Sequence, residues 1–308
     1  MNLLNFINKF PDEESCMLKF KSIRESEGVI CANCGSKEHY WKNDKWQYEC
    51  KKCKRRTTLR SGTVMHGSKL PFRYWFIAMH LLTSTKKSFS ALELQRQLGH
   101  KRYEPIWKML HKLREAMGKR DEKYTLSGQI ELDEGFFSTE IPLDQKDKPL
   151  KRGRGSQKKT KVLVMVESKD SDDKKNRRGK PRKVGHLKMQ VIDNLESNTI
   201  TPVVKDKVSK DSYINSDDST SYNRLKEIVI THKPQVIPKE KIGVALPWVH
   251  ITISNAKRLF TDIYHDIKPE YLQNYLNEFC YKFNRRYFGE SLFDRLLVAS
   301  VNHKNQFR

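Results

Sequence analysis

The sequence predicts a multidomain α/β protein, and three observations support that expectation. Two closely spaced cysteine pairs stand near the N-terminus, apolar residues then recur at helical spacing, and strand-like runs alternate with helices from residue 128. The expected parts are a helical leader (1–25), a cysteine-bearing domain (26–60), a helical domain (70–118), an α/β domain (128–290) and a C-terminal tail (291–308).

The chain is strongly basic: its 308 residues include 60 Lys and Arg against 37 Asp and Glu, a net charge of +23. Because the excess is spread along the whole length, we expect a polyanionic partner, most often a nucleic acid, with a membrane surface as the alternative. No apolar run approaches the ~18 residues of a spanning helix, and the N-terminus lacks a signal-peptide layout. The expected location is therefore the cytoplasm, in association with the nucleoid.

Four of the six cysteines form two Cys-x2-Cys pairs, Cys31/Cys34 and Cys50/Cys53, separated by fifteen residues. Each pair places two thiolates on one tight turn, and four thiolates complete a tetrahedron around Zn²⁺. Aromatic strand formers lie between the pairs, so a zinc ribbon is predicted, with chance spacing of free thiols as the alternative. Four cysteines leave no open coordination position, which favours a structural zinc ion.

Helical spacing of apolar residues predicts three helices, over 72–82, 91–98 and 103–117. A tight turn before the third helix is typical of a helix-turn-helix, although a generic helical bundle uses the same pattern. Basic residues adjoin the second cysteine pair and the third helix, and phosphate contact is favoured over a purely solvated face. These candidate DNA-binding residues are Lys51, Lys52, Arg55, Arg56, Arg102, Lys108 and Lys112.

The α/β domain opens on the strand-like stretch 129–137, which carries acids between apolar residues. A period of two places Glu131 and Asp133 on one face of the strand and Glu134 on the other. Strands deplete Asp, and burial of an unpaired carboxylate is unfavourable, so such an acid needs a partner such as a divalent cation. An edge strand with a solvated acid is the alternative.

Further strands are expected at 162–166, 186–192 and 212–215, and helices at 198–208, 220–227, 250–265 and 269–287. The segments 146–161 and 173–183 are polar and basic, and we expect flexible loops there that contact DNA backbone. Asp217 directly follows the fourth strand, and chemistry in α/β sheets gathers where strands end. Carboxylates from two neighbouring strands would bind Mg²⁺, which prefers oxygen ligands.

Nearly the whole chain resembles the DDE-type bacterial insertion-sequence transposases, in particular the subgroup with an N-terminal zinc ribbon and an Asn in place of the last Glu. The resemblance implies an RNase H-like catalytic core, a mixed sheet flanked by helices, after the zinc ribbon and the helix-turn-helix. It rests on the four cysteines and on the segments Glu131-Leu132-Asp133-Glu134, Ser216-Asp217-Asp218-Ser219-Thr220-Ser221-Tyr222, Trp248–Arg258 and Glu278–Arg286.

Carried over residue by residue, the resemblance implies that Asp133 and Asp217 are the first two ligands of a catalytic Mg²⁺ or Mn²⁺ and that Asn255 is the third. An Asn binds such a cation only through a neutral amide oxygen, so it neutralises less charge than a carboxylate would. The resemblance also implies that His250 contacts phosphate or the attacking water. Lys257 and Arg258 follow Asn255 on the same helix and are expected to contact DNA backbone.

Alternatives stay open at these positions. Asp218 adjoins Asp217 and offers a second candidate ligand, and Glu131 or Glu134 offers another first carboxylate. Of these, Glu131 is expected to be a solvated or salt-bridged neighbour of Asp133. Asn255 taken alone is more typical of a helix N-cap.

The resemblance implies a transposase that binds the terminal inverted repeats of its element, cleaves a strand to free a 3′-OH and joins that end to target DNA. It also implies a homodimer or a larger assembly on DNA. The alternatives are a DNA-binding regulator with an inactive core and a structure-selective nuclease. These three differ in the DNA products that form with Mg²⁺ or Mn²⁺.

Overall fold

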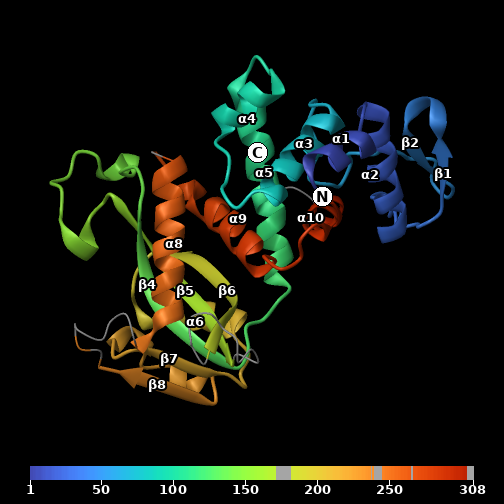
Figure 1. Ribbon diagram of the computed structural model, residues 1–308. Helices are drawn as coiled ribbons and strands as arrows, with labels where there is room; N and C mark the ends of the chain where they lie inside the picture. Colours follow the sequence, from blue (N-terminus) through green and yellow to red (C-terminus); the bar gives the residue numbers. More distant parts are fainter. Residues whose placement is uncertain (171–181, 237, 239–244, 265, 304–308) are drawn as a thin grey trace. The chain divides into compact units, whose positions relative to one another are not determined.

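The computed structural model of the protein describes residues 1–170, 182–236, 238, 245–264 and 266–303 (Figure 1). The chain folds as two compact units, one made of Met1–Arg120 with Arg285–Arg308 and the other of Asp121–Asn284. The first unit is therefore built from both ends of the chain, whereas the second is continuous in sequence.

The first unit begins with two helices followed by a small antiparallel sheet. These elements are α1 (Leu3–Lys9), α2 (Glu13–Glu27), β1 (His39–Lys42), the 3-10 turn η1 (Asn43–Lys45), β2 (Gln47–Cys50) and β3 (Arg56–Thr58). The buried Arg24 of α2 donates hydrogen bonds to the carbonyl oxygens of Thr58, Leu59 and Ser61. A guanidinium with several donors thus ties α2 to the end of the sheet.

Three further helices follow in this unit, namely α3 (Phe72–Ser84), α4 (Ala91–Leu98) and α5 (Tyr103–Glu122). All three were predicted, and α5 continues beyond its expected end at residue 117. Ser90 caps the start of α4, because its side chain accepts a hydrogen bond from the Glu93 N–H at 3.0 Å. Gly99, with φ of 61°, caps its end. That these helices form a helix-turn-helix and recognise DNA stays a prediction.

Residues 291–302, which were expected to lie in a C-terminal tail, instead form helix α10 (Ser291–Asn302). Helix α10 packs against α2 and α3, and its Phe293, Leu296 and Leu297 are buried. The Val64 N–H donates a hydrogen bond to the Ser300 carbonyl oxygen at 3.0 Å. Apolar residues recur at helical spacing within 291–302. The surface that α10 covers, however, is formed by residues more than two hundred positions away.

The second unit contains a five-stranded mixed sheet in the order β6-β5-β4-β7-β8. Its strands are β4 (Gln129–Ser138), β5 (Lys159–Asp170), β6 (Arg182–Ile192), β7 (Tyr213–Asp217) and β8 (Thr231–Gln235). Strands β4, β5 and β6 pair antiparallel, and β7 and β8 add to the β4 edge in parallel. The expected mixed sheet flanked by helices is confirmed.

Two predictions for the second half of this unit were wrong. Strand β8 was not expected, because residues 228–243 are mixed in composition and include Pro234. A proline is tolerated in β8 because it is an edge strand. Residues 220–227, expected as one helix, form the 3-10 turns η4 (Thr220–Tyr222) and η5 (Leu225–Glu227).

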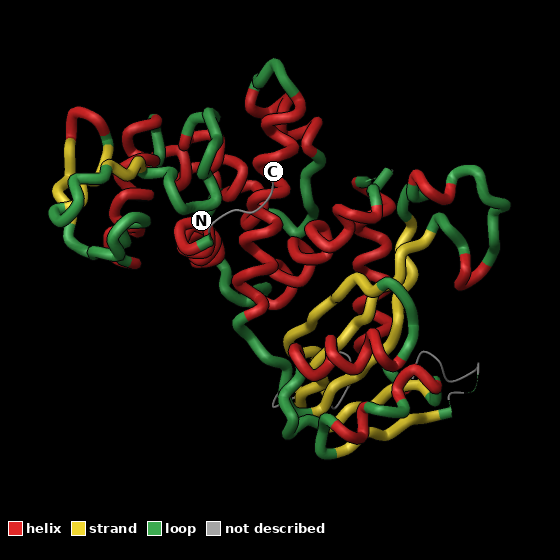
Figure 2. The backbone as a smooth tube through the Cα atoms, turned by 180° about the vertical axis from the view of Figure 1, so that it is seen from behind, coloured by secondary structure: helices red, strands yellow, loops and turns green. Residues whose placement is uncertain are grey.

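Helices cover both faces of the sheet (Figures 1 and 2). Helix α8 (Pro247–Ile263) lies against β4 and β5, and α6 (Ser197–Lys207) packs on the other face. Alternate residues of β5 divide between the two cores: Val162 and Val164 pack with α8, whereas Leu163 and Met165 pack with α6. Burial on both faces explains why β5 is a continuous apolar run.

Helix α9 (Leu272–Asn284), which follows the turn η7 (Pro269–Tyr271), covers the β6 edge of the sheet with two amide side chains. The Gln273 amide accepts a hydrogen bond from the Val191 N–H at 2.9 Å and donates to the Met189 carbonyl oxygen at 3.1 Å. Asn284 accepts from the Leu187 N–H at 2.8 Å and donates to the same residue's carbonyl oxygen at 3.0 Å. These bonds satisfy backbone groups that an open edge strand would expose.

The two basic segments differ from the expected loops. Residues 146–161 contain the turn η3 (Gly153–Gly155) and the start of β5, and the turn η2 (Leu143–Gln145) precedes them. Of the second segment, 173–181 lies outside the described residues and 182–183 begin β6. In the part of the chain that the structure describes, no helix combines the length and hydrophobicity needed to cross a membrane.

Candidate functional site

Two carboxylates lie where the parallel strands β4 and β7 separate. Glu131 and Asn215 are the last paired residues of these strands. Asp133 and Asp217 each follow two residues later, so each projects from the same face of its strand as that last pair. Beyond the pair the backbones no longer bond to each other, and the two side chains can turn toward the space between the strands.

Glu134 joins these two acids in one cluster. Carboxylate oxygens of Asp133, Glu134 and Asp217 lie within 4.8 Å of one another. Oδ1 of Asp217 is buried and has no hydrogen-bond partner among the described residues. Carboxylates this close repel one another unless a proton or a cation compensates their charge, and oxygen ligands suit Mg²⁺ or Mn²⁺. Asp218, the alternative to Asp217, is exposed and outside the cluster.

Helix α8 brings His250 to the same place. The imidazole Nδ1 lies 3.4 Å from Oδ2 of Asp133. Burial lowers the pKa of His250, while the charge of Asp217 acts in the opposite direction. The other ring nitrogen, Nε2, is buried without a hydrogen-bond partner in the described part of the chain. The contact with Asp133 thus orients that carboxylate and leaves Nε2 for a bound ligand.

Asn255, the predicted third ligand, lies on an exposed part of α8. The buried stripe of this helix contains Val249, Ile253 and Ala256. His250 and Asn255 are five residues apart, which in an α-helix is one full turn plus roughly 140°. The Asn255 side chain therefore points well away from the side of α8 that carries His250. Its role as a ligand stays a prediction, and Glu134 offers a third oxygen ligand from the strand that carries Asp133.

Tyr222 lies against Glu134 and was not predicted as part of the site. Its side chain is fully buried. Burial and the neighbouring charge of Glu134 raise the pKa of Tyr222 far above its usual range. The phenol is therefore neutral beside Glu134. The only sequence signal for it was its place in the segment that begins with Ser216 and Asp217.

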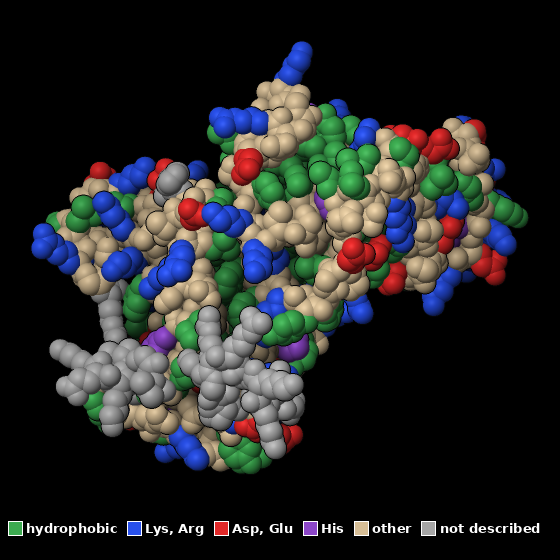
Figure 3. All heavy atoms as spheres, in the orientation of Figure 1, with side chains coloured by type: hydrophobic (Ala, Val, Ile, Leu, Met, Phe, Trp, Pro, Cys, Tyr) green, Lys and Arg blue, Asp and Glu red, His purple; other side chains and the backbone are tan. Residues whose placement is uncertain are grey.

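Positive side chains border the acid cluster. Burial and the charge of Lys159 lower the pKa of Lys257, whereas Asp133 raises it. The Lys257 ammonium also lies 5.8 Å from the centre of the Phe137 ring. Arg258 is exposed. Figure 3 shows Lys and Arg side chains gathered over the β4–β5 connection and α8, which fits a surface for a polyanion.

Glu131 was expected to be a solvated or salt-bridged neighbour of Asp133, and the structure shows that it is not solvated. It is 5% exposed, and its Oε2 accepts hydrogen bonds from the backbone N–H groups of Trp248 at 2.7 Å and Val249 at 3.0 Å. The carboxylate therefore binds the N-terminus of α8, where the helix dipole favours negative charge. Sequence reasoning missed this contact because the two partners are more than a hundred residues apart.

The four predicted zinc ligands form a second candidate site, in the first unit. The sulfur atoms of Cys31, Cys34, Cys50 and Cys53 lie within 4.8 Å of one another. Sγ of Cys31 is 3.5 Å from Sγ of Cys53, and Sγ of Cys34 is 3.5 Å from that of Cys50. Thiolates at the corners of a zinc tetrahedron would be about 3.8 Å apart, given Zn–S bonds of ~2.3 Å. The arrangement fits a closed, structural zinc site.

Both cysteine pairs use the same backbone turn. The N–H of Gly35 bonds to the Cys31 carbonyl oxygen at 2.9 Å, and that of Lys54 bonds to Cys50 at 3.0 Å. Gly35 and Lys54 both have positive φ, 70° and 62°. The Arg55 N–H donates to Cys53 and lowers the pKa of this thiol, whereas the pKa of Cys34 is raised because burial and the other three cysteine sulfurs outweigh the Ser36 N–H donor. A lowered pKa favours the thiolate, which is the metal-binding form.

The predicted DNA-binding residues of the first unit differ in exposure. Lys108 is partly exposed and pairs with Glu104 at 2.9 Å. Lys112 donates a hydrogen bond to the His66 carbonyl oxygen at 2.9 Å, and burial lowers its pKa. Lys112 therefore already has a structural partner. The exposed members of the set are Lys51, Lys52, Arg55, Arg56 and Arg102.

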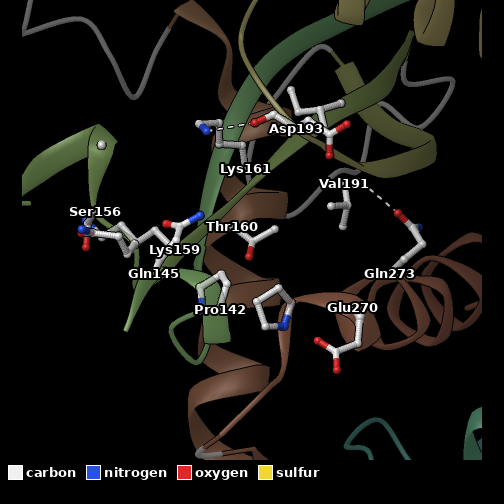
Figure 4. A pocket seen from close by; sticks show the side chains of 14 residues that line it. Pro142, Gln145, Ser156, Lys159, Thr160, Lys161, Val191, Asp193, Glu270 and Gln273 are labelled. Carbon is white, nitrogen blue, oxygen red and sulfur yellow. Dashed lines mark hydrogen bonds between the residues drawn. The ribbon is translucent and has the colours of Figure 1, made fainter. Parts of the chain in front are cut away.

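A cavity of about 490 Å³ also lies in the second unit (Figure 4). Its lining includes Lys159, Lys161 and Glu270, and the Lys161 ammonium donates a hydrogen bond to the Asp193 carbonyl oxygen at 3.0 Å. None of the three clustered acids lines this cavity. It is therefore separate from the acid cluster.

Comparison with known proteins places these features in a family. The sequence profile of the ISXO2-like transposase domain matches residues 125–284, just over half of the chain. An uncharacterized protein in transposable element ISH50 of Halobacterium salinarum is 25% identical over 169 residues. That match covers 52% of this chain and 56% of the relative, so the chain spans about half the length of this curated protein.

Among solved structures, a pre-cleavage Mos1 transpososome aligns with 77% of this chain and 82% of its own at 12% identity, with a TM-score of 0.28. A score this low does not establish a shared fold. The profile match, in contrast, includes the whole five-stranded sheet, the acid cluster and α8. The chain accordingly belongs to the family that carries the ISXO2-like transposase domain.

Proposed function

We propose that this insertion-sequence transposase binds the terminal inverted repeats of its element, cleaves a strand at the element end and joins the freed 3′-OH to target DNA. The observation that carries the proposal is the cluster of Asp133, Glu134 and Asp217 beside His250. Zinc bound by the four cysteines would stabilise the ribbon and take no part in the chemistry.

The residues of the cluster fit a divalent cation. Asp133, Glu134 and Asp217 together supply hard oxygen ligands, and Oδ1 of Asp217 lacks another partner in the described structure. Mg²⁺ or Mn²⁺ bound there would activate the attacking oxygen and offset charge on the phosphate. Asn255 stays a proposed additional ligand, which would need to reach the cluster from the exposed part of α8.

The chemistry requires two displacements at phosphorus. In cleavage, a water oxygen forms a bond to the scissile phosphorus while the bond to the 3′ oxygen breaks, which leaves a 3′-OH and a 5′-phosphate. In joining, that 3′ oxygen attacks a target phosphorus and displaces the target's own 3′ oxygen. Cleavage hydrolyses one phosphoester bond, and joining exchanges one phosphoester bond for another. Neither step therefore needs an energy-rich co-reactant.

The surrounding residues would bind DNA and position it. Lys159, Lys257 and Arg258 lie on the two elements that border the acid cluster and would contact backbone phosphates. The zinc ribbon and the helices α3 to α5 would recognise the element ends. A homodimer or larger assembly would bring two ends together.

The test is to incubate the full chain with labelled element-end DNA and target DNA in Mg²⁺ or Mn²⁺. We expect joined products from the wild type and none from Asp133→Asn or Asp217→Asn, with binding of element ends unchanged in both variants. Cleavage without joining would indicate a nuclease, and binding without products would indicate a regulator; either result would overturn the proposal.

The same assay separates the candidate third ligands. Glu134→Gln should reduce cleavage more than Asn255→Ala, because Glu134 is within the cluster and Asn255 is exposed. Equal loss in the two variants would restore Asn255 as a ligand. Glu196→Gln is a suitable control, since Glu196 is exposed and belongs to the other face of the sheet.

A further inference from the structure

We propose that Glu131 is a positioning residue, which fixes the start of α8 so that His250 stays in register with the acid cluster. The catalytic consequence rests on the proposed function, but the anchoring of α8 does not. Glu131 is not a member of the acid cluster, and the proposed function gives it no contact with a metal ion or with DNA.

The N-cap residue of α8 supplies no side-chain cap. Leu246 occupies the N-cap position and makes no side-chain hydrogen bond, and Pro247 follows it in the first turn. Helices leave their first N–H groups without backbone partners, and an apolar N-cap residue cannot satisfy them. Oε2 of Glu131 accepts two of these, from Trp248 at 2.7 Å and Val249 at 3.0 Å. The missing cap is thus supplied by β4.

The chemistry of the cap makes it strong. The acceptor is a carboxylate that is 5% exposed, so water competes little for it. Hydrogen bonds to an ionised acceptor are roughly twice as strong as neutral ones, and the negative charge complements the positive end of the helix. One oxygen atom that binds two consecutive N–H groups also restricts rotation of α8 about its axis.

The position of Glu131 links this cap to the site. Glu131 and Asp133 lie two residues apart on the same face of β4, and Val249 immediately precedes His250. One strand therefore positions both partners of the contact between Asp133 Oδ2 and His250 Nδ1, which measures 3.4 Å. A slide or rotation of α8 at its start would therefore move His250 out of that contact.

The first arm of the test measures anchoring by amide hydrogen exchange in the full chain, with mass spectrometry of peptides that span the start of α8. Glu131→Ala should speed exchange of the Trp248 and Val249 amides by at least about tenfold, since each loses a charge-assisted bond. Glu131→Gln keeps one acceptor oxygen and should show a smaller increase. Glu196→Gln is the matched control, because Glu196 precedes α6 at its N-cap position but makes no side-chain cap bond.

The second arm measures cleavage of element-end DNA at saturating DNA concentration, together with the Kd for that DNA. Glu131→Ala should lower the cleavage rate about 10- to 100-fold and leave the Kd unchanged, because misplacement of a catalytic group by about 1 Å has effects of this size. Rescue by Glu131→Gln to within a few-fold of the wild type would support a positioning role.

The two arms have separate outcomes. Unchanged exchange at the start of α8 in Glu131→Ala would overturn the anchoring, whatever the activity. Faster exchange with a wild-type cleavage rate would overturn the link to the site. If the wild type itself cleaved no DNA, the proposed function would fail while the exchange arm still decided whether Glu131 anchors α8. Circular dichroism shows whether Glu131→Ala is folded, and Glu131→Gln provides the exchange measurement if it is not.

Discussion

Among single residues, Glu167 of β5 illustrates how a buried carboxylate can stay ionised. Its side chain is fully buried, and it accepts hydrogen bonds from the Tyr124 hydroxyl at 2.8 Å, the Ser127 N–H at 3.0 Å and the His186 N–H at 3.0 Å. The Lys169 ammonium lies 3.0 Å away. Burial raises the pKa of Glu167, but the side chain and N–H of His186, the Tyr124 hydroxyl and the Ser127 N–H outweigh it and lower the pKa to about 2.

This lowered pKa predicts a pH dependence of stability. An acid with a lowered pKa contributes stability above its unfolded pKa, which for Glu is 4.5, and loses that contribution as the pH falls toward 2. Glu167→Gln should therefore reduce the free energy of unfolding by about 3 kcal/mol at pH 7. The difference from the wild type should shrink progressively between pH 4.5 and pH 2.

Urea unfolding followed by circular dichroism over this pH range checks the prediction. Asp170→Asn is the control, because the Asp170 side chain is 84% exposed on the same strand. A difference between wild type and Glu167→Gln that stayed constant from pH 7 to pH 3 would contradict the assigned pKa.

At the scale of elements, the contact between β4 and α8 depends on a glycine. A Cβ atom at Gly135 would lie 2.8 Å from Cε2 of Phe137 and 3.6 Å from side-chain carbons of Ile253. The Phe137 ring is buried and packs near Phe260 of α8. The sequence placed a glycine in this strand, but only the packing of the helix explains why a side chain there would be excluded.

Gly135→Ala should therefore lower the free energy of unfolding by about 1–3 kcal/mol, because the added methyl group pushes the Phe137 ring out of place. The thermal midpoint of the second unit measures the change. Gly155→Ala is the matched control, since a Cβ atom there meets nothing within 4 Å and needs no unusual φ. Equal thermal midpoints for Gly135→Ala and Gly155→Ala would show that the core accommodates the added methyl group without strain.

At the scale of the whole molecule, the first unit is completed by the far end of the chain. Helix α10 buries Leu292, Phe293, Leu296 and Leu297 within that unit. It also accepts the backbone bond from Val64, and the Ser300 hydroxyl donates to the Met79 sulfur at 3.5 Å. Burial of several large apolar side chains is worth several kcal/mol, a large share of a domain's net stability.

A chain that ends at residue 290 should therefore unfold its first unit at a lower temperature, while the transition of the second unit, 121–284, stays in place. Differential scanning calorimetry separates the two transitions, and limited proteolysis should show faster cleavage within residues 1–120. A chain that ends at residue 303 keeps all of α10 and serves as the control. Identical first transitions in the two truncated chains would mean that α10 is not needed by the first unit.

Spacing between near neighbours in the sequence was enough to predict several parts of the structure. Residue types and periods predicted the cysteine pairs, the three helices after residue 70 and the apolar run of β5, because a knuckle, a helix or a strand needs only near neighbours. The choice of Asp133 and Asp217 among the neighbouring acids came from the family resemblance. The family was also identified at this level, and the profile match over 125–284 confirms it.

Contacts between groups that are distant in the sequence could be assigned from the folded structure alone. It placed Glu134 with the two predicted acids, although the period of two assigned it to the opposite face, because β4 and β7 separate after residues 131 and 215. The structure also shows that Asn255 lies on an exposed part of α8 and that Glu131 caps the start of that helix. Such contacts depend on strand register and helix rotation, which are set by packing between segments more than eighty residues apart and leave no period in the sequence.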